Sequence, residues 1–162
     1  MDMICDYPNF GLSISIDGTN EIYEWVRGAS YEQTINNCQT YMTRTGIKLA
    51  VACTPTLFTL YSMDKYLLEM RDLGCFHTIN IQWCSSPLYV SIAAEKNINH
   101  YNIKYKNFLE KWTGPKIHSE ENLYNRKYNC GINKSDVRSW IEFMNSKRGF
   151  DIRHYVPELN KF

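Results

Sequence analysis

Small polar side chains stand at the ends of three apolar segments of this sequence, where they could bind a ligand. They are Ser13, Ser15 and Asp17 in the first segment, Cys53, Thr54 and Thr56 after the second, and residues 82–86 after the third. Hydroxyl and amide groups donate and accept hydrogen bonds, as a ribose or a nucleobase requires. Asp17 is the only charged side chain among them, so this set suits ligand binding better than general acid–base catalysis.

Arg27 follows the first of these segments closely enough to reach the same place. Its planar guanidinium could hold a carboxylate through two parallel hydrogen bonds. A structural role is the alternative for each of these residues. Asp17-Gly18 is a common turn pair, Thr54-Pro55 can simply end a strand, and Arg27 suits the end of a helix. The pattern alone leaves both interpretations open.

The candidate residues depend on an α/β framework that brings strand ends together. Apolar and partly alternating segments predict strands over residues 10–17, 47–53 and 78–83, with a short fourth strand at 89–92. The stretches between them predict helices over 21–26, 30–43 and 62–72. This alternation predicts parallel strands joined by crossover helices, with the candidate residues at the carboxyl edge of the sheet.

The pattern changes after residue 92. Residues 95–112 and 134–147 have the apolar spacing of helices, and the tail at 150–157 is predicted to be extended. We therefore expect an α/β segment over residues 1–92 and a C-terminal helical extension over residues 93–162, packed together as a single compact unit.

Length and charge exclude several classes of protein. The chain has 162 residues, 18 of them basic and 17 acidic, and a complete (β/α)8 barrel needs about 250 residues. The balanced charge gives no basic surface for nucleic acid or an anionic membrane. No apolar run is long enough to span a bilayer, and the first residues lack a signal-peptide pattern. We expect a cytoplasmic protein without a nucleic-acid or membrane partner.

Six cysteines raise the question of a metal site or a disulfide framework. They are Cys5, Cys38, Cys53, Cys75, Cys84 and Cys130. No two form a Cys-x-x-Cys pair, and the four histidines are scattered along the chain. We therefore expect reduced and mostly buried thiols with no metal ligands, and a zinc or disulfide site is the alternative.

The segment from Ser13 to Gly28 resembles the central part of radical S-adenosylmethionine (SAM) enzymes, best those with a Twitch or SPASM type of extension. A strand ending in Ser-Ile-Asp-Gly is followed there by a short helix and Arg-Gly, as at residues 15–18 and 27–28 here. The breaks at residues 53–56 and 86–89 and the end at residues 148–159 are similar to those of the same family. The resemblance covers most of the chain, best over residues 10–92.

The resemblance implies a SAM-binding partial (β/α) barrel with a C-terminal helical extension. By position, Ser15 would contact the ribose or the amino-acid part of the cofactor, and Arg27 would hold its carboxylate. Thr54 and Gln82 would line the cofactor pocket. Catalytic residues and the substrate are not identified by these motifs.

The chain departs from the family in one respect. The Cys-x-x-x-Cys-x-x-Cys loop that holds a [4Fe–4S] cluster in the family is missing, and a cluster needs thiolate ligands. We therefore expect the C-terminal half of a radical SAM enzyme, with the cluster supplied by an N-terminal half or a partner subunit. The alternatives are a non-catalytic remnant that binds SAM, a nucleotide or a peptide, and a scaffold protein.

Overall fold

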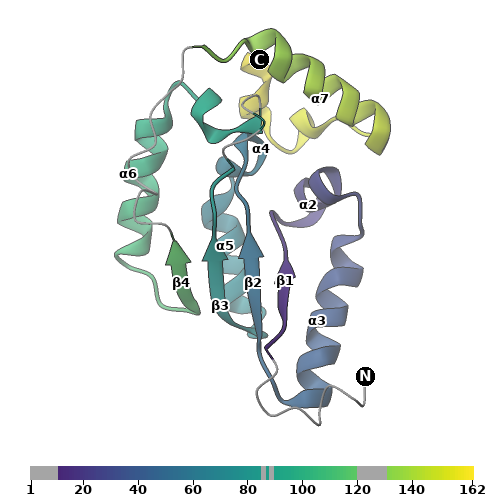
Figure 1. The fold of residues 1–162 in the computed structure, drawn as a ribbon, viewed down its shortest axis with the longest axis vertical. Coiled ribbons are helices and arrows are strands. Elements are labelled where there is room, and N and C mark those ends of the chain that lie inside the picture. The colour runs from purple at the N-terminus through teal and green to yellow at the C-terminus, as the bar shows by residue number, and fades with distance from the viewer. Residues whose placement is uncertain (1–10, 85–86, 88–89, 120–130) are drawn as a thin grey trace.

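A computed structural model describes residues 11–84, 87, 90–119 and 131–162. In it, four strands form one all-parallel sheet whose spatial order is the chain order, β1-β2-β3-β4 (Figure 1). They are β1 (Ser13–Ser15), β2 (Leu49–Cys53), β3 (Phe76–Ile81) and β4 (Lys116–Ser119). The predicted α/β class with parallel strands is therefore confirmed.

Helices make every connection between these strands, as parallel pairing requires. The first connection is α2 (Asn20–Arg27) and α3 (Tyr31–Thr45), the second α4 (Leu57–Leu60) and α5 (Met63–Asp72), and the third the 3-10 helix η2 (Ile92–Ala94) and α6 (Ile98–Leu109). After β4 come α7 (Lys134–Arg148), η3 (Ile152–His154) and η4 (Pro157–Lys161).

Local sequence signals set the start and the end of α3. The Ser30 side chain accepts a hydrogen bond from the backbone N–H of Gln33 over 3.2 Å, and this fixes the start of α3. Gly46 ends the helix with a left-handed φ of 69°, a conformation that favours glycine. Both signals lie in the sequence itself. The helix predicted over residues 30–43 is therefore confirmed, with its bounds shifted by one residue at the start and two at the end.

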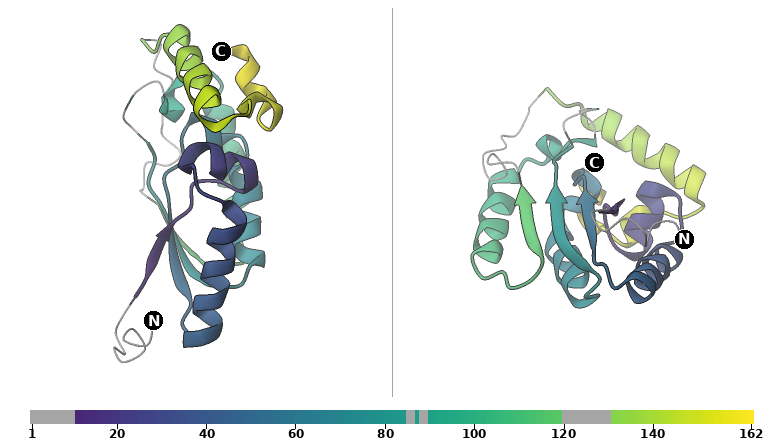
Figure 2. Two further views of the ribbon diagram at one scale, coloured as in Figure 1. Left: turned by 90° about the vertical axis from the view of Figure 1, so that its right-hand side faces the viewer. Right: turned by 60° about the horizontal axis from the view of Figure 1, so that its bottom comes forward.

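The two faces of the sheet differ in character. Ile14, Val51, Ile79 and Ile117 are paired across the strands and belong to a core shared with α3, α5 and α6. Neighbouring residues on a strand point to opposite faces, so the alternate residues form a second, polar face. In the described part of the chain the helices cover only the first face (Figure 2).

We call this second face the open face. It consists of two rows of paired residues, Ser13, Ala50, Thr78 and Lys116 in one and Ser15, Ala52, Asn80 and His118 in the other. Ser13, Ser15, Asn80, Lys116 and His118 are all exposed.

A second core lies beyond the carboxyl ends of the strands. Trp25 of α2, Phe58 of α4 and Ile141 of α7 are almost fully buried in it. The rings of Trp25 and Phe58 meet edge to face with centroids 4.9 Å apart. The C-terminal residues 134–162 thus pack directly on α2, the helix that carries Arg27 (Figure 1).

Three details differ from the sequence prediction. The strand expected at 89–92 is wrong in its described part, because Ser91 caps η2 by accepting from the N–H of Ala93, and residue 89 lies outside the described residues. The fourth strand is instead Lys116–Ser119, within the segment predicted as a helical extension. The tail at 150–157 is not extended, because Asp151 caps η3 through the N–H of Arg153.

No helix in the described residues is long and apolar enough to cross a membrane.

Candidate ligand-binding site at the carboxyl ends of the strands

Asp17 joins the ends of the first two strands. Its side chain is 5% exposed, and its Oδ1 accepts a hydrogen bond from the backbone N–H of Thr54 over 2.7 Å. Ile16 next to it donates its N–H to the carbonyl of Ala52 over 2.9 Å. The Asp17 carboxylate therefore extends the β1–β2 ladder by one side-chain bond and fixes the position of Thr54.

Arg27 returns from the end of α2 to the same carboxylate. Its Nε lies 2.5 Å from Oδ2 of Asp17, and its Nη2 donates to Oγ of Ser15 over 2.5 Å. Nε and Nη2 of the guanidinium thus bond to Asp17 and Ser15 within the protein. Among the described residues nothing accepts from Nη1, and the Arg27 side chain is 38% exposed, so its outer edge can still donate to a ligand.

Thr54 and Gln82 occupy the next two strand ends. The N–H of Gln82 donates to the carbonyl of Cys53 over 2.9 Å, so β3 ends beside β2 at the same level. Gln82 is exposed and alternates with the buried Ile81, which puts its side chain on the open face with Ser15. The structure thus brings Ser15 and Arg27 into direct contact. It links Thr54 to Arg27 through the Asp17 carboxylate. Gln82 lies at the end of β3, next to the end of β2.

The position of Arg27 depends on the C-terminal segment. Trp25, two residues earlier in α2, donates from its indole N–H to Oδ1 of Asn145 over 2.9 Å. Arg148 donates from Nε to the carbonyl of Trp25 over 2.9 Å. Asn145 in turn donates to Asp151 over 2.8 Å and accepts from the N–H of Ile152 over 3.1 Å. These bonds hold the last turn of α2 against α7.

The cysteine near this site is not poised as a nucleophile. Burial raises the pKa of the Cys53 thiol, and the nearby Asp17 carboxylate adds to the effect. The thiol stays protonated at neutral pH, whereas the thiolate is the reactive form.

The described cysteines do not form a cluster site. Cys38 lies in α3, Cys53 ends β2 and Cys75 lies between α5 and β3. All three are buried, and burial raises the pKa of each thiol, of Cys38 to about 11. No group of three metal-ligating side chains occurs in the described ranges. Cys5 and Cys130 lie outside them. These thiols do not fit the ligand set of a [4Fe–4S] cluster.

The arrangement at the strand ends can bind but has no evident acid–base pair. It offers the hydroxyl of Ser15, the exposed N–H groups of Arg27 and the carboxamide of Gln82, with Thr54 beside them. These groups suit the carboxylate and hydroxyl groups of a ligand. Sequence reasoning named Asp17 only as a turn residue or a charge at this edge. Its linking role depends on the register between β1 and β2, which no local pattern specifies.

No protein-family model, curated protein or solved structure matches the chain.

Proposed function

We propose that this protein binds S-adenosylmethionine at the carboxyl ends of its strands, as the cofactor-holding part of a radical SAM-like enzyme. The observation that carries the proposal is the contact of Arg27 with both Asp17 and Ser15. It holds a guanidinium rigidly at the sheet edge while leaving terminal N–H groups for a ligand carboxylate.

Each of the other residues has a role that its position supports. The Ser15 hydroxyl accepts from Arg27 and keeps its own hydrogen for a ribose or amino-acid oxygen. Thr54 and Gln82, at the ends of the next two strands, would contact the cofactor from the side of β2 and β3. Within the described ranges, helices cover one face of the sheet only (Figure 2). This supports a partial (β/α) barrel, since the inner face of a barrel sheet carries no helices.

Bound SAM would supply a sulfonium centre whose reductive cleavage needs an electron. The cysteines of the described chain do not fit the cluster that would deliver it, so we derive no radical step from these residues. A [4Fe–4S] cluster would have to come from an N-terminal half or a partner subunit.

The edge of β1 suits such a partner. Leu12 accepts from Ala50 and Ile16 donates to Ala52, so by alternation the main-chain groups of Ser13 and Ser15 point away from β2. A strand from another polypeptide could pair there. An exposed strand edge is also a template for unspecific pairing. Without such a partner, the protein should therefore tend to aggregate.

A non-catalytic binding protein is the second candidate. The observation that favours it is that the described thiols are mostly buried and form no cluster ligand set. SAM could then bind at the strand ends without being cleaved. The two candidates differ in one outcome, since only the first gains SAM-cleaving activity when a polypeptide with the cysteine loop is added.

The proposal is tested by calorimetric titration of SAM into the protein and into two serine variants. Ser15→Ala should weaken SAM binding by about tenfold, since it removes a hydroxyl contact and frees Arg27. Ser13→Ala is the matched control, because Ser13 lies on the same face of the same strand but away from Arg27. An absence of SAM binding, or equal losses in the two variants, would overturn the proposal.

A further inference from the structure

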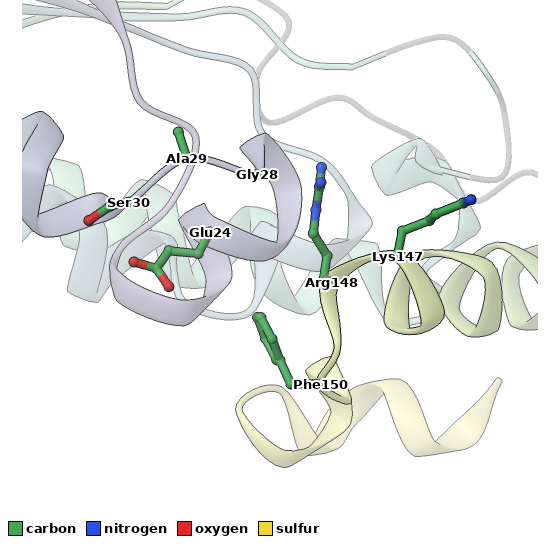
Figure 3. A pocket seen from close by; sticks show the side chains of 7 residues that line it. All are labelled: Glu24, Gly28, Ala29, Ser30, Lys147, Arg148 and Phe150. Atoms are coloured by element: carbon green, nitrogen blue, oxygen red, sulfur yellow. The ribbon is translucent and has the colours of Figure 1, made fainter.

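We infer that a second site, between the α2–α3 junction and the end of α7, binds a small zwitterion with the ammonium and carboxylate groups of an α-amino acid. A cavity of about 350 Å³ opens there. It is lined by residues 28–30 and by Glu24, Lys147, Arg148 and Phe150 (Figure 3). Its volume is within the range of small-molecule sites.

Arg148 brings a positive charge with unused donors to this cavity. Its Nε donates to the carbonyl of Trp25 over 2.9 Å, which fixes the guanidinium beside the end of α2. The terminal nitrogens of Arg148 have no acceptor among the described residues. Two N–H groups at the tip of a fixed guanidinium match the two oxygens of a carboxylate.

Glu24 brings a negative charge on the opposite flank. Its Oε1 accepts from the backbone N–H of Tyr31 over 3.0 Å, so the side chain is held in place. Its second oxygen has no donor within the described ranges. No ion pair joins Glu24 to Arg148, although both line the same cavity. Each charge is therefore fixed by a backbone group and has capacity left for a ligand.

Lys147 also lines the cavity, but its ammonium group is directed to another part of the surface. Its Nζ lies 5.6 Å from the centroid of the Phe143 ring, and Figure 3 shows its side chain directed away from the end of α2. The cavity therefore holds one fixed charge of each sign. A simple anion would be repelled by Glu24 and a simple cation by Arg148, whereas a zwitterion satisfies both.

Phe150 provides an apolar wall for the ligand side chain. Its ring packs edge to face on Tyr155 with centroids 5.7 Å apart, so its orientation is fixed. Gly28, which also lines the cavity, packs directly against the guanidinium, since a Cβ atom there would lie 2.7 Å from Cζ of Arg148. An amino acid with an aromatic side chain fits this combination of charges and surfaces.

The test uses L-phenylalanine as the probe, with backbone amide shifts as the readout. We expect saturable shifts in residues 24–30 and 147–150, with a dissociation constant on the order of 1 mM for so small a ligand. N-acetyl-L-phenylalanine lacks the ammonium group and L-phenylalaninamide lacks the carboxylate. Each should bind about tenfold or more weakly, because one charge of the cavity is left without its partner.

Two variants separate this site from its surroundings. Glu24→Gln keeps an oxygen for the Tyr31 N–H and should weaken L-phenylalanine binding by about tenfold. Glu32→Gln makes the same change at an exposed carboxylate outside the cavity and should leave binding unchanged.

The inference is overturned if L-phenylalanine gives no saturable shifts. It is also overturned if the two blocked forms bind as well as L-phenylalanine, or if Glu32→Gln weakens binding as much as Glu24→Gln. SAM titration of Ser15→Ala tests the strand-end site alone, so the two sites can fail independently.

Discussion

Arg27 donates from Nε to the buried carboxylate of Asp17 over 2.5 Å, and this pair joins the end of α2 to the end of β1. The same carboxylate accepts from the N–H of Thr54 at the end of β2. Three chain segments that are separate in sequence therefore meet at one side chain. The buried Asp17 carboxylate holds the candidate binding site together, because one of its oxygens bonds to Thr54 and the other to Arg27.

Removing the Asp17 carboxylate should destabilise the fold. Asp17→Ala leaves the Thr54 N–H without its acceptor and Arg27 without its counter-ion, and we expect a loss of about 2 kcal/mol in the free energy of unfolding. The partial exposure of Arg27 keeps the figure below that of a fully buried pair. Urea denaturation measures it.

Asp72→Ala is the matched control, since Asp72 pairs with Arg71 at the surface. That change should leave the free energy of unfolding unchanged. Equal effects of the two substitutions would show that Asp17 does not join the segments as described.

Asn145 should be a main determinant of the contact between α2 and α7. Its carboxamide accepts from Trp25 and Ile152 and donates to Asp151. Asn145→Ala should lower the free energy of unfolding by about 2 kcal/mol, because partly buried donors and acceptors are left unpaired. Ser146→Ala, one residue on, should change it by less than about 0.5 kcal/mol, as its hydroxyl bonds only to its own helix. Thermal and urea unfolding of both variants test this.

Gly28 and Gly46 form a matched pair of helix-ending glycines. Both have a left-handed φ, of 72° and 69°, but only Gly28 lies against Arg148, and nothing is near Gly46. Gly46→Ala should cost about 1 kcal/mol of stability from backbone strain alone. Gly28→Ala should cost more, because Arg148 must also leave the carbonyl of Trp25.

The Arg148→Ala background isolates this contact. In it, the difference between the two glycine substitutions should disappear. If Gly28→Ala and Gly46→Ala are equally destabilising in the unmodified protein, the close approach of Arg148 has no energetic consequence.

Glu95 should make stability depend on pH in the acid range. Burial by itself raises the pKa of this carboxyl, but hydrogen bonds from Lys161, Tyr61 and the N–H of Asn97 outweigh it, so its pKa lies below the ordinary value. Stability from Glu95 is therefore present above the ordinary pKa of 4.5 and is lost as the pH falls through the folded-state value.

A second carboxyl acts in the same direction. The hydrogen bond from Arg153 lowers the pKa of Asp151 to about 2 from 3.8, so its contribution is lost between these values. Denaturation curves at pH 7, 4 and 3 should show a steep loss in the unmodified protein. A Glu95→Gln variant should be less stable at pH 7 and depend less on pH. An unchanged pH dependence in this variant would contradict the role of Glu95.

Parts of this structure follow from local sequence signals. The helix from Tyr31 to Thr45 has a serine cap and a glycine end, and Leu49–Cys53 is a short apolar run between breaks, so both could be predicted. The strand Lys116–Ser119 could not, because it has four residues and a single apolar side chain, Ile117. Pairing with β3 makes it a strand, and pairing partners are not a local property.

The candidate sites likewise combine features that the sequence predicts with features that depend on tertiary contacts. The alternation of strands and helices predicted parallel strands and hence that Ser15 and Gln82 share an edge of the sheet. The role of Asp17 could not be predicted, because it depends on the register between β1 and β2. The cavity at Glu24 and Arg148 depends on a contact between residues 123 positions apart, Trp25 and Arg148. Nothing near either residue in the sequence indicates the other.

The most direct test of the central claim is a titration of SAM followed by backbone amide shifts. We expect saturable changes that are largest at Ser15, Arg27, Thr54 and Gln82 and small at Ser13 and on the β4 edge of the sheet. An absence of saturable changes, or changes that avoid these four residues, would contradict a SAM site at the carboxyl ends of the strands.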